Sequence, residues 1–251
     1  MTDVTAGPPA PGASPGQGAE PPTDQATDQA TAATGGPVPA ATGVPTPRAV
    51  AARLARPGAE PQRPAALPAP GRVFAYVDNS NVWIEGQRLQ AVRLGHARTP
   101  QHAMANQITA PWRYDFGRLY ELACPPGSMV GRSFLVGSKP PPGDSVWNRA
   151  RNEGFHVLTY DRNAAGKEKQ VDASLLTWLL DDSYQHMDAA RGDLAVLVAG
   201  DGDFLPAVNS LQRRDLTVRV LSWEHACSRA LREGADEFLP LDPYFGWLTN
   251  A

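Results

Sequence analysis

From residue 72 onward, short runs of apolar residues alternate with longer segments in which apolar residues recur at helical spacing. The short Val- and Leu-rich runs predict strands at residues 73–77, 129–136, 155–160, 194–199, 217–222 and 237–241. The segments between them predict helices at residues 82–89, 114–123, 145–153, 171–187, 204–213 and 224–233. Such alternation is typical of a mainly parallel sheet with helices on both faces, so the pattern predicts an α/β fold. Residues 90–111 interrupt it, and we interpret them as a mobile insertion or a partly helical excursion.

The first 70 residues differ from the rest of the chain in composition. They contain 15 of the 25 prolines, mixed with Ala, Gly, Thr and Gln, and they contain no Ile, Phe, Trp or Tyr. A segment with so little apolar surface cannot offset the entropy that it would lose on folding. We therefore expect residues 1–70 to form a disordered tail with polyproline character, followed by one folded domain at residues 71–248. Recruitment of a protein partner by the tail is an alternative to a plain solvated segment.

The charge balance sets limits on the partners of the domain. The chain has a formal net charge of −3, and four arginines against five acids in the first 70 residues leave −2 for the domain. RNA binding would therefore need local basic patches. The two cysteines, Cys124 and Cys227, show no paired spacing and are expected to be buried or free thiols in a reducing compartment. No apolar run reaches membrane-spanning length and no leader pattern opens the chain, so we expect a cytoplasmic protein, with self-association left open.

Four aspartates lie where this fold would bring them together. Asp78 directly follows the first predicted strand, and Asp201 follows the fourth. Asp172 lies in the first turn of a predicted helix, and Asp203 lies in the turn that opens the next helix. Parallel strands joined by right-handed crossovers end at one edge of the sheet, and the crossover helices begin there. The sequence therefore predicts that the four carboxylates meet at the carboxyl edge of the sheet.

Carboxylates gathered in this way repel one another unless a divalent cation lies between them. Oxygen ligands suit Mg²⁺ or Mn²⁺, and such ions promote hydrolysis of phosphate esters by polarising the phosphoryl oxygen and lowering the pKa of water. Taken singly, each aspartate is explained more simply as a helix cap or a turn former, whereas the combination favours a metal site. Asp181 and Asp182, farther along their helix, are expected to face solvent. Asn81 either caps the first helix or orients a metal-bound water or a phosphate.

A phosphodiester substrate also needs cationic side chains beside the acidic pocket. Four of them lie in loops expected at the same edge, and we assign them as candidate substrate-binding residues: Lys139, Arg162, Lys167 and Lys169. Each is also explained as an ordinary solvated residue. Trp83 and Trp147 could stack on unpaired bases, although core packing is the favoured interpretation for both. The chain shows no Cys/His zinc pattern and no glycine-rich phosphate loop.

Three segments resemble the motifs of NYN domains, a branch of the PIN-like ribonuclease fold. They are Tyr76-Val77-Asp78-Asn79-Ser80-Asn81, Lys169-Gln170-Val171-Asp172 and Ala199-Gly200-Asp201-Gly202-Asp203-Phe204-Leu205-Pro206. Gly137-Ser138-Lys139-Pro140-Pro141 is similar to a loop of LabA-like members. Ala199 replaces the serine that is usual in the third motif, which removes a hydroxyl but no carboxylate.

The resemblance implies a three-layer α/β/α sandwich with a PIN-like fold and metal-dependent cleavage of RNA. Asp78, Asp172, Asp201 and Asp203 match the acidic positions of the family as catalytic and metal-binding residues, and Asn81 matches a polar position. Our main hypothesis is an Mg²⁺- or Mn²⁺-dependent endoribonuclease. The alternative is a non-catalytic regulatory module that binds RNA or protein through the same edge. A small-ester phosphatase also fits the metal chemistry, but Asp78 is followed by Asn79-Ser80 rather than by the second aspartate of an Asp-x-Asp nucleophile motif.

Overall fold

The computed structural model of the chain describes residues 71–138, 145–160 and 169–250, so the predicted tail lies outside the described residues. The described chain forms one six-stranded sheet in the order β3-β2-β1-β4-β5-β6, and every neighbouring pair is parallel. The strands are β1 (Arg72–Asp78), β2 (Met129–Ser138), β3 (His156–Tyr160), β4 (Leu194–Val198), β5 (Thr217–Ser222) and β6 (Glu237–Pro240). All the predicted strands are confirmed.

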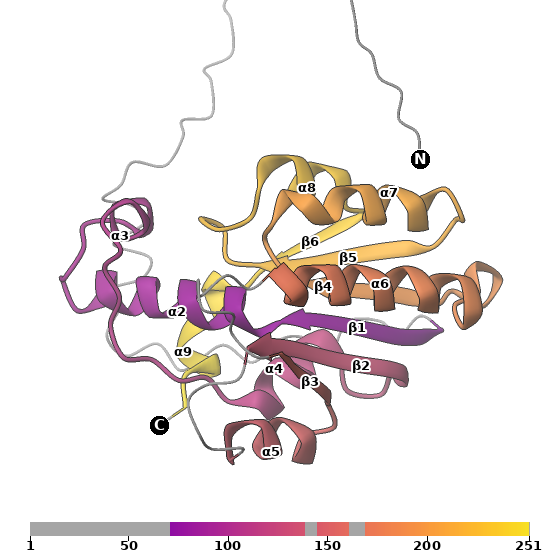
Figure 1. Cartoon of the computed structure of the whole chain (residues 1–251), viewed down its shortest axis with the longest axis horizontal. Coiled ribbons are helices and arrows are strands. Elements are labelled where there is room, and N and C mark those ends of the chain that lie inside the picture. Colours follow the sequence, from indigo (N-terminus) through magenta and orange to yellow (C-terminus); the bar gives the residue numbers. More distant parts are fainter. Residues whose placement is uncertain (1–70, 139–144, 161–168, 251) are drawn as a thin grey trace, which may run out of the picture. The chain divides into compact units, whose positions relative to one another are not determined.

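Helices cover both faces of the sheet, which confirms the three-layer α/β/α sandwich (Figure 1). The α-helices are α2 (Asn79–Arg93), α3 (Pro100–Ala105), α4 (Phe116–Ala123), α5 (Ser145–Asn152), α6 (Lys169–Gln185), α7 (Leu205–Gln212), α8 (Arg229–Gly234) and α9 (Phe245–Leu248). Short 3₁₀ helices occur at η1 (Ala189–Arg191), η2 (Gly202–Phe204) and η3 (Asp242–Tyr244). No helix in the described part of the chain is both long and apolar enough to span a membrane.

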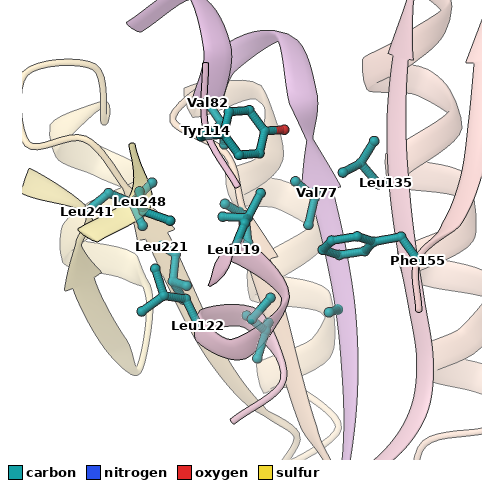
Figure 2. Close-up of a cluster of buried hydrophobic side chains, with 14 of the residues drawn as sticks. Val77, Val82, Tyr114, Leu119, Leu122, Leu135, Phe155, Leu221, Leu241 and Leu248 are labelled. Carbon is teal, nitrogen blue, oxygen red and sulfur yellow. The ribbon is translucent and has the colours of Figure 1, made fainter. Parts of the chain in front are cut away.

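Alternation along the strands divides the core into two clusters. Val73, Ala75 and Val77 of β1 face the cluster that α4, α5 and α9 cover, whereas Phe74 and Tyr76 face the cluster under α6, α7 and α8. Figure 2 shows the first cluster, where the side chains of α4 pack against those of the strands. Burial of both faces explains why the strands are continuous apolar runs rather than alternating ones.

The crossover from β1 to β2 contains the predicted excursion at residues 90–111. Helix α2 continues to Arg93, α3 follows, and α2 and α3 lie beyond the edge of the sheet (Figure 1). Aromatic residues hold α2 in place. Trp112 lies so close to Gly86 that a Cβ there would be 2.0 Å from its ring, and the Trp223 indole donates to the backbone oxygen of Val82 at 3.0 Å. The prediction of a partly helical excursion is confirmed.

Two local predictions were wrong. Helix α8 begins at Arg229 rather than at residue 224. The Glu224 amide donates a hydrogen bond to the Asp242 carboxylate instead of entering a helix, and Ser228 caps the helix. Asp182 is buried rather than solvent-facing. Its carboxylate accepts the hydroxyl of Tyr76 at 2.8 Å and pairs with Arg132 at 3.1 Å.

The burial of Asp182 follows from helical spacing. Leu175 and Leu179 face the core, and Asp182, three residues farther on, continues the same stripe of α6. The contact also fixes the direction of α6. Asp182 lies near the end of this helix and Arg132 lies near the start of β2, so α6 runs antiparallel to the strands.

Candidate functional site

Asp78 is the last residue of β1 and is 7% exposed. Its Oδ1 atom accepts the backbone N–H groups of Ser80 at 3.0 Å and Asn81 at 3.1 Å, so Asp78 caps α2. A cap in this position orients the carboxylate against the positive end of the helix dipole. The interpretation of Asn81 as the cap is therefore wrong. Asn81 is the third residue of α2 and is partly exposed.

Asp201 and Asp203 lie in the loop that follows β4, and both are exposed. The Oδ1 atom of Asp201 accepts the backbone N–H of Asp203 at 2.9 Å and caps η2. Gly200 allows the loop to lie against residues 223–228, because a Cβ at this position would be 2.4 Å from the backbone oxygen of Ala226. The Ser228 amide donates to the Gly200 oxygen at 2.8 Å. The loop that carries the two aspartates is thus anchored to the loop after β5.

The sheet brings Asp78 and Asp201 to the same edge. Strands β1 and β4 are parallel neighbours, with Val77 opposite Val198. Asp78 follows this pair by one residue and Asp201 follows it by three, so both aspartates leave adjacent strands at their carboxyl ends. The strand order also reverses between β1 and β4, which is where open α/β sheets form their ligand crevice.

Asp172 lies in the first turn of α6 and is partly exposed. Because α6 runs antiparallel to the strands, this turn points toward their carboxyl ends. Lys169 is the first residue of the same helix. The other three basic candidates, Lys139, Arg162 and Lys167, lie outside the described residues.

A partly buried pair that the sequence pattern did not indicate lies beside Asp78. The Tyr114 hydroxyl donates to Oδ1 of Asn79 at 2.5 Å, and Asn79 packs against Gly137 of β2, where a Cβ would be 3.3 Å from the Asn79 amide nitrogen. Burial, together with the nearby charge of Asp78, raises the pKa of Tyr114, so its hydroxyl stays protonated and remains a donor. The pair fixes the start of α2. The apolar pattern around Tyr114 gave no signal for the partner of its hydroxyl.

The model of the NYN domain matches residues 79–242 of this chain. The chain belongs to the NYN domain family. This is a PIN-like ribonuclease family, and the match includes Asp172, Asp201 and Asp203 and begins one residue after Asp78. The resemblance stated from the motifs is therefore confirmed.

A solved structure supports the same fold for the NYN domain. The crystal structure of a protein of unknown function from Vibrio parahaemolyticus is similar with a TM-score of 0.50 and 17% identity, over 70% of this chain and 96% of that chain. At this identity the similarity shows the fold alone. No curated protein matches the chain.

NYN family nucleases typically use divalent metal ions. In the described part of this NYN domain, no group of three or more His, Cys, Asp or Glu side chains is placed to hold a metal ion, so these residues form no closed protein cage. Mg²⁺ seldom needs one, because it keeps several waters and is bound by one or two carboxylates together with substrate phosphates. Asp78 and Asp201 provide hard oxygen donors at adjacent strand ends, so the donor set fits an open, largely hydrated site.

Two tryptophans were candidates for stacking on bases. Trp147 is buried in the cluster under α5, so its predicted core role is confirmed. Trp83 is 38% exposed on the first turns of α2, so the expectation that it packs into the core is wrong.

The two cysteines are free, as expected, and burial raises the pKa of the Cys124 thiol to about 12.

Proposed function

We propose that this NYN domain is an Mg²⁺- or Mn²⁺-dependent endoribonuclease that hydrolyses RNA phosphodiester bonds at the carboxyl edge of its sheet. The observation that carries the proposal is the position of Asp78 and Asp201 at the ends of adjacent parallel strands, on either side of the switch in strand order. Membership of a PIN-like ribonuclease family supports RNA as the substrate.

Each residue of the site has a separate role in this proposal. Asp78 and Asp201 hold the cation, with their orientations set by the amides that they cap, and Asp172 and Asp203 complete the negative cluster directly or through water. Asn81, Lys139, Arg162, Lys167 and Lys169 contact the phosphates of the strand. When bound, the cation polarises the phosphoryl oxygen and lowers the pKa of water. The protein itself orients the RNA and holds the acids against their mutual repulsion.

One observation favours the alternative, a non-catalytic module that binds RNA through the same edge. Without a preassembled group of three acids in the described residues, the cation must be recruited together with water or substrate. A protein that only binds RNA has no need of the cation. The two functions therefore differ in what a chelator does to the RNA.

The test is incubation of the full chain with end-labelled RNAs in Mn²⁺, in Mg²⁺ or in excess chelator, followed by sequencing of the RNA ends. We expect new internal ends with either metal and intact RNA with the chelator. RNA that is bound but stays intact under all conditions would establish the binding module instead. Cleavage that persists in the chelator would contradict the metal-dependent site.

A further inference from the structure

The segment that lies beyond the edge of the sheet is basic, although the protein as a whole is acidic. Residues 86–114 contain no Asp or Glu, although the whole chain carries a net charge of −3. The same stretch contains two histidines and four arginines, namely Arg88, Arg93, Arg98 and Arg113. A local excess of one charge on a protein of opposite net charge attracts a polyanion to that segment.

The helix that carries the start of this basic segment begins at the acidic site. Helix α2 begins at the residue after Asp78, and Figure 1 shows α2 and α3 projecting past the strand ends. At the rise of an α-helix, Arg88 lies about 15 Å and Arg93 about 22 Å along the helix from Asp78. An RNA strand that follows α2 from the far end of the helix therefore arrives at the acidic edge of the sheet.

The arginines differ in their freedom to bind an anion. Arg98 and Arg113 are exposed, and their side chains form no ion pair or hydrogen bond with any residue that the structure describes. Arg93 is exposed, and its guanidinium lies over the Phe245 ring at 4.9 Å. Arg88 is paired with Glu85 and contributes less.

Trp83 adds an aromatic surface to the start of this segment. It lies one helical turn after Asn79, and its indole N–H donates to the backbone oxygen of Trp112 at 3.1 Å, which fixes the ring while 38% of the residue remains exposed. An immobilised, exposed indole in a segment with exposed arginines has the form of a stacking platform for an unpaired base. In a duplex the bases are already stacked on one another, so they cannot use it.

We propose that residues 86–113 together with Trp83, here called the basic arm, bind an unpaired RNA strand and lead it to the acidic site. Arg93, Arg98 and Arg113 contact backbone phosphates, and Trp83 stacks on a base near Asp78. The direction of the strand rests on the proposed nuclease function, whereas the binding itself does not. For this reason the test measures binding in the absence of metal.

The first test is the salt dependence of binding between the full chain and a fluorescent single-stranded RNA in excess chelator. Loss of two phosphate contacts in Arg98→Gln/Arg113→Gln should make the log–log slope of affinity against salt less steep by about 1.4, at about 0.7 per contact. Arg149→Gln/Arg213→Gln is the matched control, since both arginines are exposed outside the arm and the net charge changes equally. The control slope should equal that of the unmodified chain.

The second test separates stacking from charge. Trp83→Ala should weaken binding about 10-fold, whereas Trp83→Phe, which keeps a ring, should stay within about threefold of the unmodified chain. Circular dichroism and thermal unfolding identify variants that fail to fold, and the phenylalanine variant still tests the stacking surface in that case. A duplex of the same sequence should bind more weakly than the single strand.

Three results would contradict RNA binding by the basic arm. The first is an equal salt slope for the arm variant and the control variant, and the second is equal affinity for duplex and single-stranded RNA. The third is a Trp83→Ala variant that changes only the oligomeric mass, which would show that this surface is a contact between copies of the chain. If the unmodified chain cleaves RNA but gives any of these results, the nuclease proposal stands and the basic arm is rejected. If the expected binding changes occur but no RNA is cleaved, the basic arm is supported and the nuclease proposal is rejected.

Discussion

Asp78→Asn should reduce metal-dependent RNA cleavage at least about 100-fold while the protein remains folded. Asparagine is as good a helix cap as aspartate, so its side-chain oxygen can still accept the amides of Ser80 and Asn81. The substitution therefore removes the negative charge and little else. Initial cleavage rates in Mn²⁺ measure the activity, and circular dichroism with thermal unfolding measures the fold.

Asp181→Asn provides the matched control for this prediction. Asp181 is an exposed residue of α6, near the end of the helix that lies away from the carboxyl edge, so its replacement should leave the cleavage rate unchanged. Asp201→Asn should behave like Asp78→Asn, because asparagine can also keep the cap on η2. Undiminished cleavage by Asp78→Asn, at equal purity and equal folding, would refute the assignment of the site.

Trp223→Ala should lower the free energy of unfolding by about 3–5 kcal/mol, which is the range for removing a fully buried tryptophan. Trp223 is fully buried, contacts the rings of Trp112 and Phe245 edge-on and at a tilt, and donates its indole N–H to Val82. The alanine would leave a cavity between β5 and α2 and would remove one hydrogen bond to the Val82 oxygen. Urea unfolding measures the loss, provided that the slope of the unfolding free energy against urea concentration is the same for both proteins.

Trp223→Phe is the comparison variant, because it fills most of the same space but loses the hydrogen bond. We expect a loss of about 0.5–1.5 kcal/mol, in line with the net contribution of one hydrogen bond. If Trp223→Ala lowered the free energy of unfolding by less than about 1 kcal/mol, the indole would not be packed in the core. The contact between α2 and the loop after β5 would then have to be revised.

Much of the fold was predictable because both faces of the sheet are buried. A strand covered on two sides is apolar at most positions, so β1 and β4 stand out as nearly unbroken runs such as residues 194–198. The positions of Asp78 and Asp201 follow from the same argument, since they are the first acidic residues after those runs. Parallel pairing then places both at one edge without knowledge of any side-chain contact.

The contacts between distant side chains were not predictable. The hydroxyl of Tyr114 reaches Asn79 across 35 positions, and the carboxylate of Asp182 reaches Tyr76 across 106, so neither leaves a trace in local periodicity. Asp78 and Asn81 are equally good capping residues by type, and only the backbone path at the end of β1 decides between them. The exposure of Trp83 depends on Trp112, which approaches α2 from the other end of the excursion.

The most direct test of the central claim is calorimetric titration of Mn²⁺ into the unmodified chain, Asp78→Asn and Asp201→Asn. If the two carboxylates share one cation at the ends of adjacent strands, the unmodified chain gives a binding heat that either single substitution removes or strongly weakens. Equal heats for all three proteins would show that Mn²⁺ binds elsewhere or not at all, and would contradict the site on which the proposed function depends.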